Sequence, residues 1–418
     1  MASTATDRIA TLDLIRGVAV MGIFSVNVIA FAMIEGAYFN PGAYGGHSGL
    51  DLWLWALNLV LVDGKMRSLF SMLFGASMLL VIDRAEAAGQ NAAAVHLRRM
   101  IVLMGFGLLH FYFIWFGDIL FSYGAVGIIA FLFRNRSARQ LAISGGGLLL
   151  VSTIMFTLFA FHMHSADLAA HAAGASAETI ADWNGIGRLL YPLPSDFMHD
   201  LAVHRGGFFG RSEYMFTERG AEPFTSLLGI GPETLGLMLL GMAGLKSGFL
   251  TGAWSDTSYR HLAWIAVPVG AIAFALLAFV DVRSHFYSPL VFGGFLALVP
   301  FRTGMALGYA ALIILAGRGM GPLAGRIEAA GRCAFTNYLG TSLVASFVFY
   351  GWGLGLYGSV SRYHAWLLAP VVWLAMLAWS KPWLERFQYG PLEWLWRSLS
   401  RGALQPMRKR PAPAPIAA

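Results

Sequence analysis

The chain has 418 residues, of which 57% are hydrophobic and 12% are charged, and its formal net charge is +7. Soluble domains carry about 25% charged residues, so half that share excludes an ordinary soluble protein and indicates a polytopic membrane protein. The single cysteine, Cys333, excludes an internal disulfide framework and a CxxC metal site. In a membrane protein, excess Lys and Arg mark cytoplasmic loops and contacts with anionic headgroups, so this charge does not indicate nucleic-acid binding.

Hydrophobic segments of about 20 residues recur along nearly the whole chain, which predicts an all-α transmembrane bundle and not a β-barrel. We expect about ten spans, at residues 14–33, 69–81, 100–115, 119–133, 141–161, 232–245, 262–280, 304–316, 334–350 and 365–377. Two shorter apolar pieces, 52–62 and 289–300, are too short to cross a bilayer. We expect them to be re-entrant or interfacial segments.

Arginine clusters lie near residues 84–99, 134–139 and 318–332 and in the C-terminal segment 397–410. All four can be cytoplasmic together only if both termini are cytoplasmic. The expected organisation is an N-terminal five-helix half, an extracytoplasmic loop, a C-terminal transmembrane domain and a disordered basic Pro/Ala tail, at 1–161, 162–223, 224–401 and 402–418.

The first span, within RIATLDLIRGVAVMGIFSVNVIAF, contains Asp13, Arg16 and Asn27. Helical geometry places these three side chains on one face. A guanidinium in the bilayer core costs at least a few kcal/mol, and less when it is paired, and Asp13 lies one turn from Arg16. The face is either a structural clamp between helices or part of a polar cavity that admits a charged ligand.

The stretch GLLHFYFIWFGDIL places His110 inside a span and Asp118 at the following turn. Histidine is the side chain best suited to proton transfer near neutral pH, and Asp118 could orient it or bind a substrate hydroxyl. The alternative is a histidine hydrogen-bonded to a neighbouring helix, with Asp118 capping the next helix.

Two further stretches suggest ligand contacts on the outer side. Lys65 and Arg67 stand at a helix N-terminus, against the macrodipole, so an anionic substrate group or a lipid headgroup would explain them. The sequence GIGPETLGLMLLGM predicts a helix that begins inside the membrane at Pro232. Unwound backbone there would line a cavity, which makes Glu233 a candidate acid, base or cation ligand.

Near the cytoplasmic side, GRCAFTNYLGTSL contains Arg332, Asn337 and Tyr338. These residues could form hydrogen bonds between helices or bind a phosphate. The aromatic-rich segment 381–399 is expected to be a surface helix and turn at the inner headgroups, where anionic lipids would be its partners. No metal-ligand spacing is present, so we expect no metal site.

Several of these stretches resemble the YeiB family of bacterial inner-membrane proteins. They are LDLIRGVAVMGIFSVN, GKMRSLFSMLFG, GLLHFYFIWFGDILFSYG, ETLGLMLLGM, GRCAFTNYL and RFQYGPLEWLWRSL. The resemblance runs in order along the chain and implies a multi-pass inner-membrane protein. The family is largely uncharacterised and is sometimes described as associated with transport.

The pattern LDxxRGxAxxxxxxxN also resembles, more distantly, the first helix of membrane acetyltransferases of the heparan-glucosaminide type, and more loosely the acyltransferase-3 family. This resemblance implies that an acyl group passes from cytoplasmic acyl-CoA, the only co-substrate expected, to an extracytoplasmic glycan or small-molecule acceptor. Asn27 cannot be the base, so the base would be His47 or His110.

A transporter or exporter of a small molecule or lipid-linked substrate is the alternative function. Broken helices and buried ionisable residues would fit that class. We expect no bound cofactor, and a homodimer remains compatible with the sequence.

Overall fold

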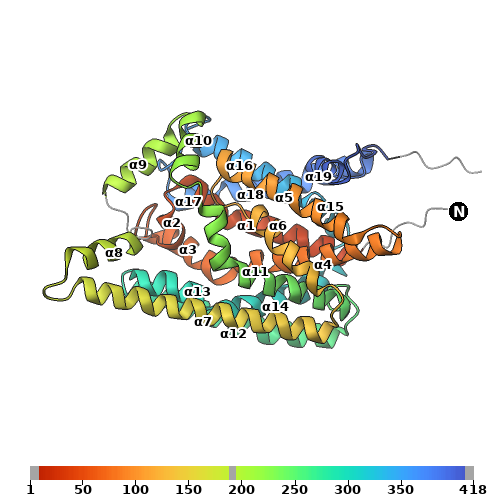
Figure 1. Cartoon of the computed structure of the whole chain (residues 1–418), viewed down its shortest axis with the longest axis horizontal. Helices are drawn as coiled ribbons and strands as arrows, with labels where there is room; N and C mark the ends of the chain where they lie inside the picture. The colour runs from red at the N-terminus through yellow and green to blue at the C-terminus, as the bar shows by residue number, and fades with distance from the viewer. Residues whose placement is uncertain (1–8, 188–193, 410–418) are drawn as a thin grey trace, which may run out of the picture.

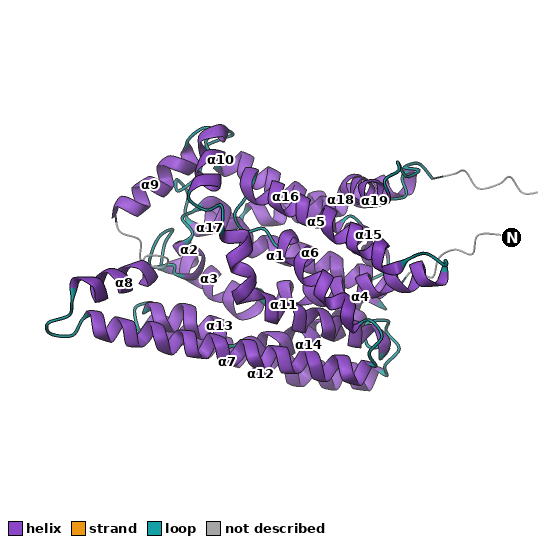
Figure 2. Cartoon of the chain, in the orientation of Figure 1, coloured by secondary structure: helices purple, strands orange, loops and turns teal. Residues whose placement is uncertain are grey.

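The computed structural model describes residues 9–187 and 194–409, and these residues fold almost entirely into helices (Figure 2). The one β-bridge in this part of the chain joins Phe387 and Arg408. The predicted all-α class is therefore confirmed.

The first half of the chain contains α1 (Ala10–Ala32), α2 (Gly36–Phe39), α3 (Gly49–Leu61), α4 (Lys65–Ala87), α5 (Ala92–Phe113), α6 (Leu120–Ala130), η1 (Phe131–Phe133), α7 (Ala138–Ala170), α8 (Ala177–Gly187), α9 (Pro194–Arg205) and α10 (Phe208–Thr217). The second half contains α11 (Glu222–Lys246), α12 (Asp256–Arg283), η2 (Pro289–Gly294), α13 (Phe295–Ala297), α14 (Val299–Gly317), α15 (Pro322–Arg332), α16 (Ala334–Phe349), α17 (Arg362–Trp366), α18 (Leu368–Arg386) and α19 (Pro391–Arg401).

Each of the ten expected spans falls on a helix. Within the described residues, eight helical segments are long and apolar enough to cross a membrane, and Leu120–Phe133 and Ala334–Phe349 are shorter apolar helices. The short apolar pieces form α3, which is joined to α4 by a tight turn, and the η2–α13 segment. The number of crossings and the side on which the termini lie stay predictions.

Helix α1 is the centre of the bundle. In its apolar part 67% of the residues are buried, against 28% for α7 and 22% for α12. It packs against α4, α14, α15, α16 and α18, whereas α7 and α12 are both drawn on the same outer side of the bundle (Figure 1). The polar residues of α1 are therefore held inside protein.

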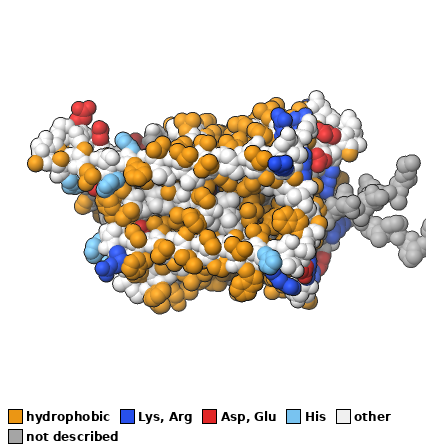
Figure 3. All heavy atoms as spheres, turned by 90° about the horizontal axis from the view of Figure 1, so that it is seen from below, with side chains coloured by type: hydrophobic (Ala, Val, Ile, Leu, Met, Phe, Trp, Pro, Cys, Tyr) orange, Lys and Arg blue, Asp and Glu red, His pale blue; other side chains and the backbone are white. Residues whose placement is uncertain are grey.

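The exposed surface is apolar over much of its area, as a lipid bilayer requires. Helix α12 exposes large apolar side chains along its length, among them Trp264, Ile272 and Phe279. On the face seen in Figure 3, apolar side chains cover the middle, and most Lys and Arg side chains gather at one end. Such a belt is the surface that hydrocarbon requires.

Helix α11 corrects one expectation. The helix does not begin at Pro232 but runs from Glu222 to Lys246 with Pro232 inside it. Transmembrane helices tolerate an internal proline because neighbouring helices hold them in place, and α11 packs on both α4 and α7. The expected unwound backbone beside Glu233 is therefore wrong.

Glycines allow α4 and α11 to touch backbone to backbone. A Cβ atom added at Gly241 would overlap the carbonyl group of Met72, and one added at Gly75 would overlap that of Met238. Close approach at small residues is the usual way in which helices pack in membranes.

Replacing Gly241 with alanine is expected to lower the stability of the folded protein by about 1–3 kcal/mol, because the helices must separate. Gly229 is the matched control, since it lies on the same helix and a Cβ there meets nothing within 4 Å. Thermal unfolding in detergent measures both variants. Equal melting temperatures for Gly241→Ala and Gly229→Ala would contradict the close contact.

The connection between the two halves is largely helical, since α7 continues to Ala170 and α8, α9 and α10 follow. Beyond α19, the backbone of residues 402–409 turns back, and the Gln388 amide donates to the carbonyl oxygen of Met407 at 2.9 Å. The remainder of the tail predicted to be disordered, 410–418, lies outside the described residues.

Candidate functional site

A pocket of about 560 Å³ lies at the end of the bundle where α1 begins. It is enclosed by the start of α1, the end of α4, the first half of α5, the junction of α15 with α16, and α19. We call it the basic pocket, because six cationic side chains line it: Arg16, Arg84, Arg99, Arg332, Arg397 and Lys409.

Two carboxylates line the same pocket, and both are engaged by the protein. Asp13 accepts a hydrogen bond from Arg16 at 2.8 Å, which confirms the pairing expected from their spacing. Glu393 accepts from the backbone amides of Phe335 and Thr336 and from the Thr336 hydroxyl, at 2.6–3.0 Å. The pocket therefore carries an excess of positive charge.

Burial shifts the pKa values of two side chains on α19. Burial, the largest cause, raises the pKa of Glu393, although the hydrogen bonds from Thr336 act in the opposite direction. Burial and the nearby charge of Arg401 lower the pKa of the Arg397 guanidinium. An anion in the pocket would oppose the lowering at Arg397.

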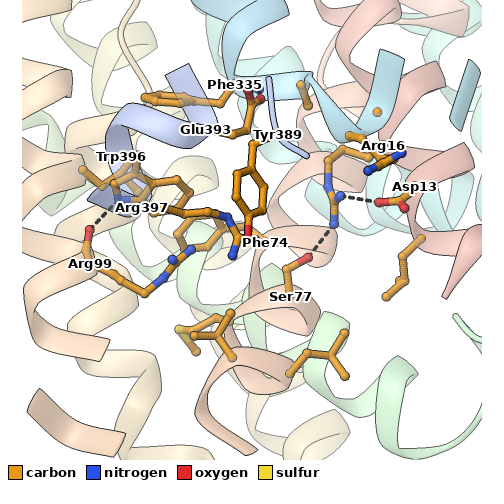
Figure 4. A pocket seen from close by; sticks show the side chains of 18 of the residues that line it. Asp13, Arg16, Phe74, Ser77, Arg99, Phe335, Tyr389, Glu393, Trp396 and Arg397 are labelled. Carbon is orange, nitrogen blue, oxygen red and sulfur yellow. Dashed lines mark hydrogen bonds and ion pairs between the residues drawn. The ribbon is translucent and has the colours of Figure 1, made fainter. Parts of the chain in front are cut away.

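Arginines approach the pocket from both sides (Figure 4). Arg99 and Arg397 lie on one side and Arg16 on the other, with the ring of Tyr389 between them. The guanidinium of Arg99 stacks over Trp396 at 4.2 Å, and that of Arg397 lies 4.6 Å from the Tyr389 ring. Arg16 also donates to the Ser77 hydroxyl at 2.6 Å. These contacts hold the guanidinium groups in place.

Away from the arginines, the wall becomes apolar and aromatic. Its deeper residues include Phe70, Phe74, Leu103, Leu120, Tyr123 and Tyr338. A cationic mouth with an apolar interior suits an amphiphile that has an anionic head.

His110 and Asp118 form a buried pair, and Asp118 also caps the next helix, so features of both arrangements that the sequence left open are present. The Nδ1 atom of His110 lies 2.8 Å from Asp118 Oδ2, and both side chains are at most 2% exposed. The other Asp118 oxygen accepts the amide of Phe121 at 2.9 Å. His110 Nε2 has no partner within the described residues. The pair therefore has the geometry of an oriented base with one nitrogen available.

Tyr338 separates this pair from the basic pocket. It lines the pocket, and its ring centroid lies 5.4 Å from that of His110. Arg99 at the pocket mouth and His110 are eleven residues apart on α5, which corresponds to about 16 Å along the helix. The pair thus lies one side chain beyond the deep wall.

A second buried network surrounds Glu233. Arg302 donates through Nε and Nη2 to the two oxygens of Glu233, both at 3.0 Å, and Arg67 donates to the same oxygens at 2.9–3.0 Å. Arg302 was not predicted. The structure places Glu233 and Arg67 in this ion network between α4, α11 and α14, not in the wall of the basic pocket.

A hydrogen bond connects the basic pocket with the turn of α4 that carries Arg67. The Ser71 and Tyr123 hydroxyls lie 2.6 Å apart, Tyr123 lines the pocket, and Ser71 lies one turn after Arg67 on α4.

Lys65 is fully buried; its Nζ donates to the carbonyl of Leu59 at 2.5 Å and lies 3.1 Å from the Phe274 ring centroid.

Three further predicted residues also lie apart from the basic pocket. Asn337 is buried, donates to Ala330 at 3.0 Å and accepts from Trp379, so it joins helices. Asn27 is partly buried on α1 about 16 Å beyond Arg16. His47 is exposed in the loop before α3, at the end of the bundle where α1 finishes.

The site residues predicted from the sequence thus lie in several separate regions of the structure. Asp13, Arg16, Arg332 and Tyr338 share the basic pocket, and His110 with Asp118 lies just behind it. In the described part of the chain, no group of three or more His, Cys, Asp or Glu side chains is placed to hold a metal.

The fold and the pocket define a polytopic helical membrane protein with a pocket that has a basic mouth and an apolar, aromatic inner wall. The chain is 32% identical to "Uncharacterized protein YeiB" of Escherichia coli (strain K12) over 96% of its own length and 98% of the relative's. It therefore belongs to the YeiB family. It is also 29% identical to "Uncharacterized protein YxaH" of Bacillus subtilis (strain 168), over 97% of each chain.

A family model described as "Protein of unknown function (DUF418)" matches residues 245–403. This region contributes Arg332, Tyr338, Glu393 and Arg397 to the basic pocket. No solved structure matches the chain.

Proposed function

We propose that the protein is a membrane acyltransferase, in which the basic pocket binds acyl-CoA and His110 removes a proton from the acceptor. The observation that carries the proposal is the position of the basic pocket, which meets an oriented histidine across a single side chain, Tyr338. We place this end of the bundle at the cytoplasmic face of the inner membrane, where acyl-CoA is available and positive charge accumulates.

The pocket suits the donor at both of its ends. Arginine and lysine side chains bind phosphate groups, and the three phosphate groups of CoA all lie in its nucleotide half, remote from the thioester. The acyl chain would occupy the apolar wall near Leu103 and Leu120. The thioester would then lie toward Tyr338, which must move aside for transfer.

The transfer step balances with the residues present. The acceptor hydroxyl or amine attacks the thioester carbon, a new ester or amide bond forms, and the carbon–sulfur bond breaks. His110 Nε2 takes the acceptor's proton and returns it to the departing thiolate. Asp118 orients the ring through Nδ1 and stabilises the charged imidazole, as in other enzymes in which an aspartate supports a histidine general base.

The donor site is tested by thermal unfolding of the detergent-purified protein with octanoyl-CoA. Ligand at one hundred times its dissociation constant stabilises the native state by about 2.7 kcal/mol. We expect octanoyl-CoA to raise the melting temperature and octanoylcarnitine, which lacks phosphates, to leave it unchanged. Equal shifts from both compounds would overturn the donor assignment, and a transporter of another substrate would then remain as the alternative.

Arg397→Gln is expected to weaken octanoyl-CoA binding by about 10- to 100-fold, because charge-assisted hydrogen bonds contribute about 1.5–3 kcal/mol. Arg401 is the matched control, since it lies one turn further on α19, is exposed and does not line the pocket. We expect Arg401→Gln to change the affinity less than about twofold. Similar losses in both variants would indicate general charge attraction in place of a defined site.

A further inference from the structure

The opposite end of the bundle, beneath α9 and α10, contains a row of buried polar side chains. Five residues along this row have a buried polar atom without a hydrogen-bond partner in the described part of the chain: His110, Trp115, His204, Arg211 and Tyr350. Arg211 has two such atoms, Nε and Nη2, and its side chain is 2% exposed. Buried polar groups are normally paired, so this concentration requires an explanation.

These side chains are in contact with one another. The rings of His110 and Trp115 are 6.3 Å apart, and Trp115 stacks on Phe31 at 4.3 Å. Phe31 in turn lies 6.3 Å from Tyr350, whose ring is 4.6 Å from the Arg211 guanidinium. A continuous row of aromatic and polar groups therefore connects Arg211 at the outer end to the candidate base.

The His204 ring packs against the same tyrosine, Tyr350, at 5.1 Å. Its Nδ1 atom faces Asp200 Oδ1 at 3.2 Å, and the Tyr357 hydroxyl donates to Asp200 at 2.5 Å. Burial by itself raises the pKa of Asp200, but the His204 and Tyr357 hydrogen bonds hold that pKa below its usual value. The Asp200 carboxylate is thus already hydrogen-bonded to these two side chains.

The other nearby acidic groups are also committed. Arg219 pairs with Glu35 at 2.8 Å and with Glu222 at 2.6 Å. Arg211 therefore contacts the Tyr350 side chain but pairs with no described carboxylate: its Nε and Nη2 atoms make no hydrogen bond of regular geometry within the described residues, while the surrounding carboxylates serve other cations. Leaving buried donors unpaired destabilises a folded protein, and the effect is larger for charged groups. An occupant that supplies oxygen acceptors and negative charge would remove this destabilisation.

We propose that this row binds a small oxyanion-bearing polyol, with its carboxylate or phosphate on Arg211 and its hydroxyl or amine toward His110. Tyr350, Trp115 and His204 supply further hydrogen-bonding atoms along the row. Calling this ligand the acyl acceptor rests on the proposed function, whereas oxyanion binding at Arg211 does not. The row and the basic pocket then approach His110 from opposite ends.

The test is thermal unfolding of the full chain in detergent at low ionic strength, followed by the fluorescence of its tryptophans. The probes are gluconate, a carboxylate polyol, glycerol 3-phosphate, a phosphate polyol, and glucose as the neutral control. We expect at least one of the two anions to raise the melting temperature and glucose to leave it unchanged. The anion that is effective identifies the headgroup.

Arg211→Gln is expected to abolish the shift and, without anion, to melt at least as high as the unaltered protein, because an unpaired buried charge has been removed. Arg283→Gln is the control, since this exposed arginine lies at the end of α12 and its loss removes one charge without touching the row. A shift that persists in Arg211→Gln, or no anion-specific shift in the unaltered protein, overturns the inference.

Arg211→Lys provides a second variant if the glutamine variant does not fold, and it should bind the effective anion at least tenfold more weakly, because it loses the two-pronged contact. Unchanged affinity in Arg211→Lys would also overturn the inference. An anion effect without an octanoyl-CoA effect would preserve this site and reject the acyltransferase. The reverse result would reject this site and preserve the donor site.

Discussion

Replacing His110 with glutamine is expected to lower the rate of acyl transfer by about 10²–10⁴-fold while the protein stays folded. A general base contributes a factor of this size, and glutamine has no basic nitrogen. The glutamine amide can still donate to Asp118, so the buried carboxylate keeps a partner. The measurement is thiol release from octanoyl-CoA with a panel of hydroxyl and amine acceptors, alongside the melting temperature.

Two further variants define what the result means. Asp118→Asn is expected to reduce the rate strongly, because the wrong histidine tautomer becomes favoured, as in hydrolases with an oriented histidine. His47→Ala is expected to leave the rate unchanged, because His47 is exposed at the loop before α3. Activity that survives in His110→Gln but is lost in His47→Ala would show that the base has been misassigned.

The sequence predicted the positions of the helices well, because apolar runs record which solvent surrounds the chain. Their ends were less predictable. Helix α7 was expected at 141–161 but spans Ala138–Ala170, since helical hydrogen bonding continues where hydropathy falls. Pro232 misled the prediction of α11 for a related reason: its effect depends on neighbouring helices that the sequence does not identify.

Local spacing explains which parts of the candidate site were predicted. Asp13 and Arg16 are one turn apart, and His110 and Asp118 are close in sequence, so their pairing follows from helix and turn geometry. Arg397 and Glu393 reach the basic pocket only because α19 packs on α5 and α16. No periodicity in the chain records that contact.

Arg302 and Arg211 were missed although a signal for each was present. Arg302 interrupts an apolar run at its beginning, and a charge there deserved a search for a buried partner. Arg211 shares a helical face with Met215, and both are buried. A basic residue on the apolar face of a surface helix indicates a specific environment, but its identity requires the tertiary structure.

Replacing Glu233 with alanine is expected to lower the stability of the folded protein by about 3–5 kcal/mol. The substitution removes the single carboxylate that both Arg67 and Arg302 contact and leaves buried positive charge without compensation. Thermal unfolding and the yield of monodisperse protein in detergent measure the loss. A folding defect of this size would show that Glu233 joins α4, α11 and α14.

Glu222 provides the comparison that isolates burial. It begins the same helix and also pairs with an arginine, Arg219, but it is 43% exposed, whereas Glu233 is 1% exposed. Exposed pairs contribute less than about 1 kcal/mol because water screens them, so Glu222→Ala should change the melting temperature little. Equal effects of the two alanine variants would mean that the buried network does not hold the helices.

Glu233→Gln separates the structural role of Glu233 from the catalytic role that the sequence suggested. If the carboxylate serves only the two arginines, the loss of charge destabilises the protein, and any folded fraction should transfer acyl groups at the rate of the unaltered protein. Replacing Arg67, Arg302 and Glu233 together with methionine, methionine and leucine should recover part of the stability, because well-packed apolar groups can substitute for a whole buried ion network. A folded, stable Glu233→Gln protein without transfer would place the carboxylate at the reacting atoms instead.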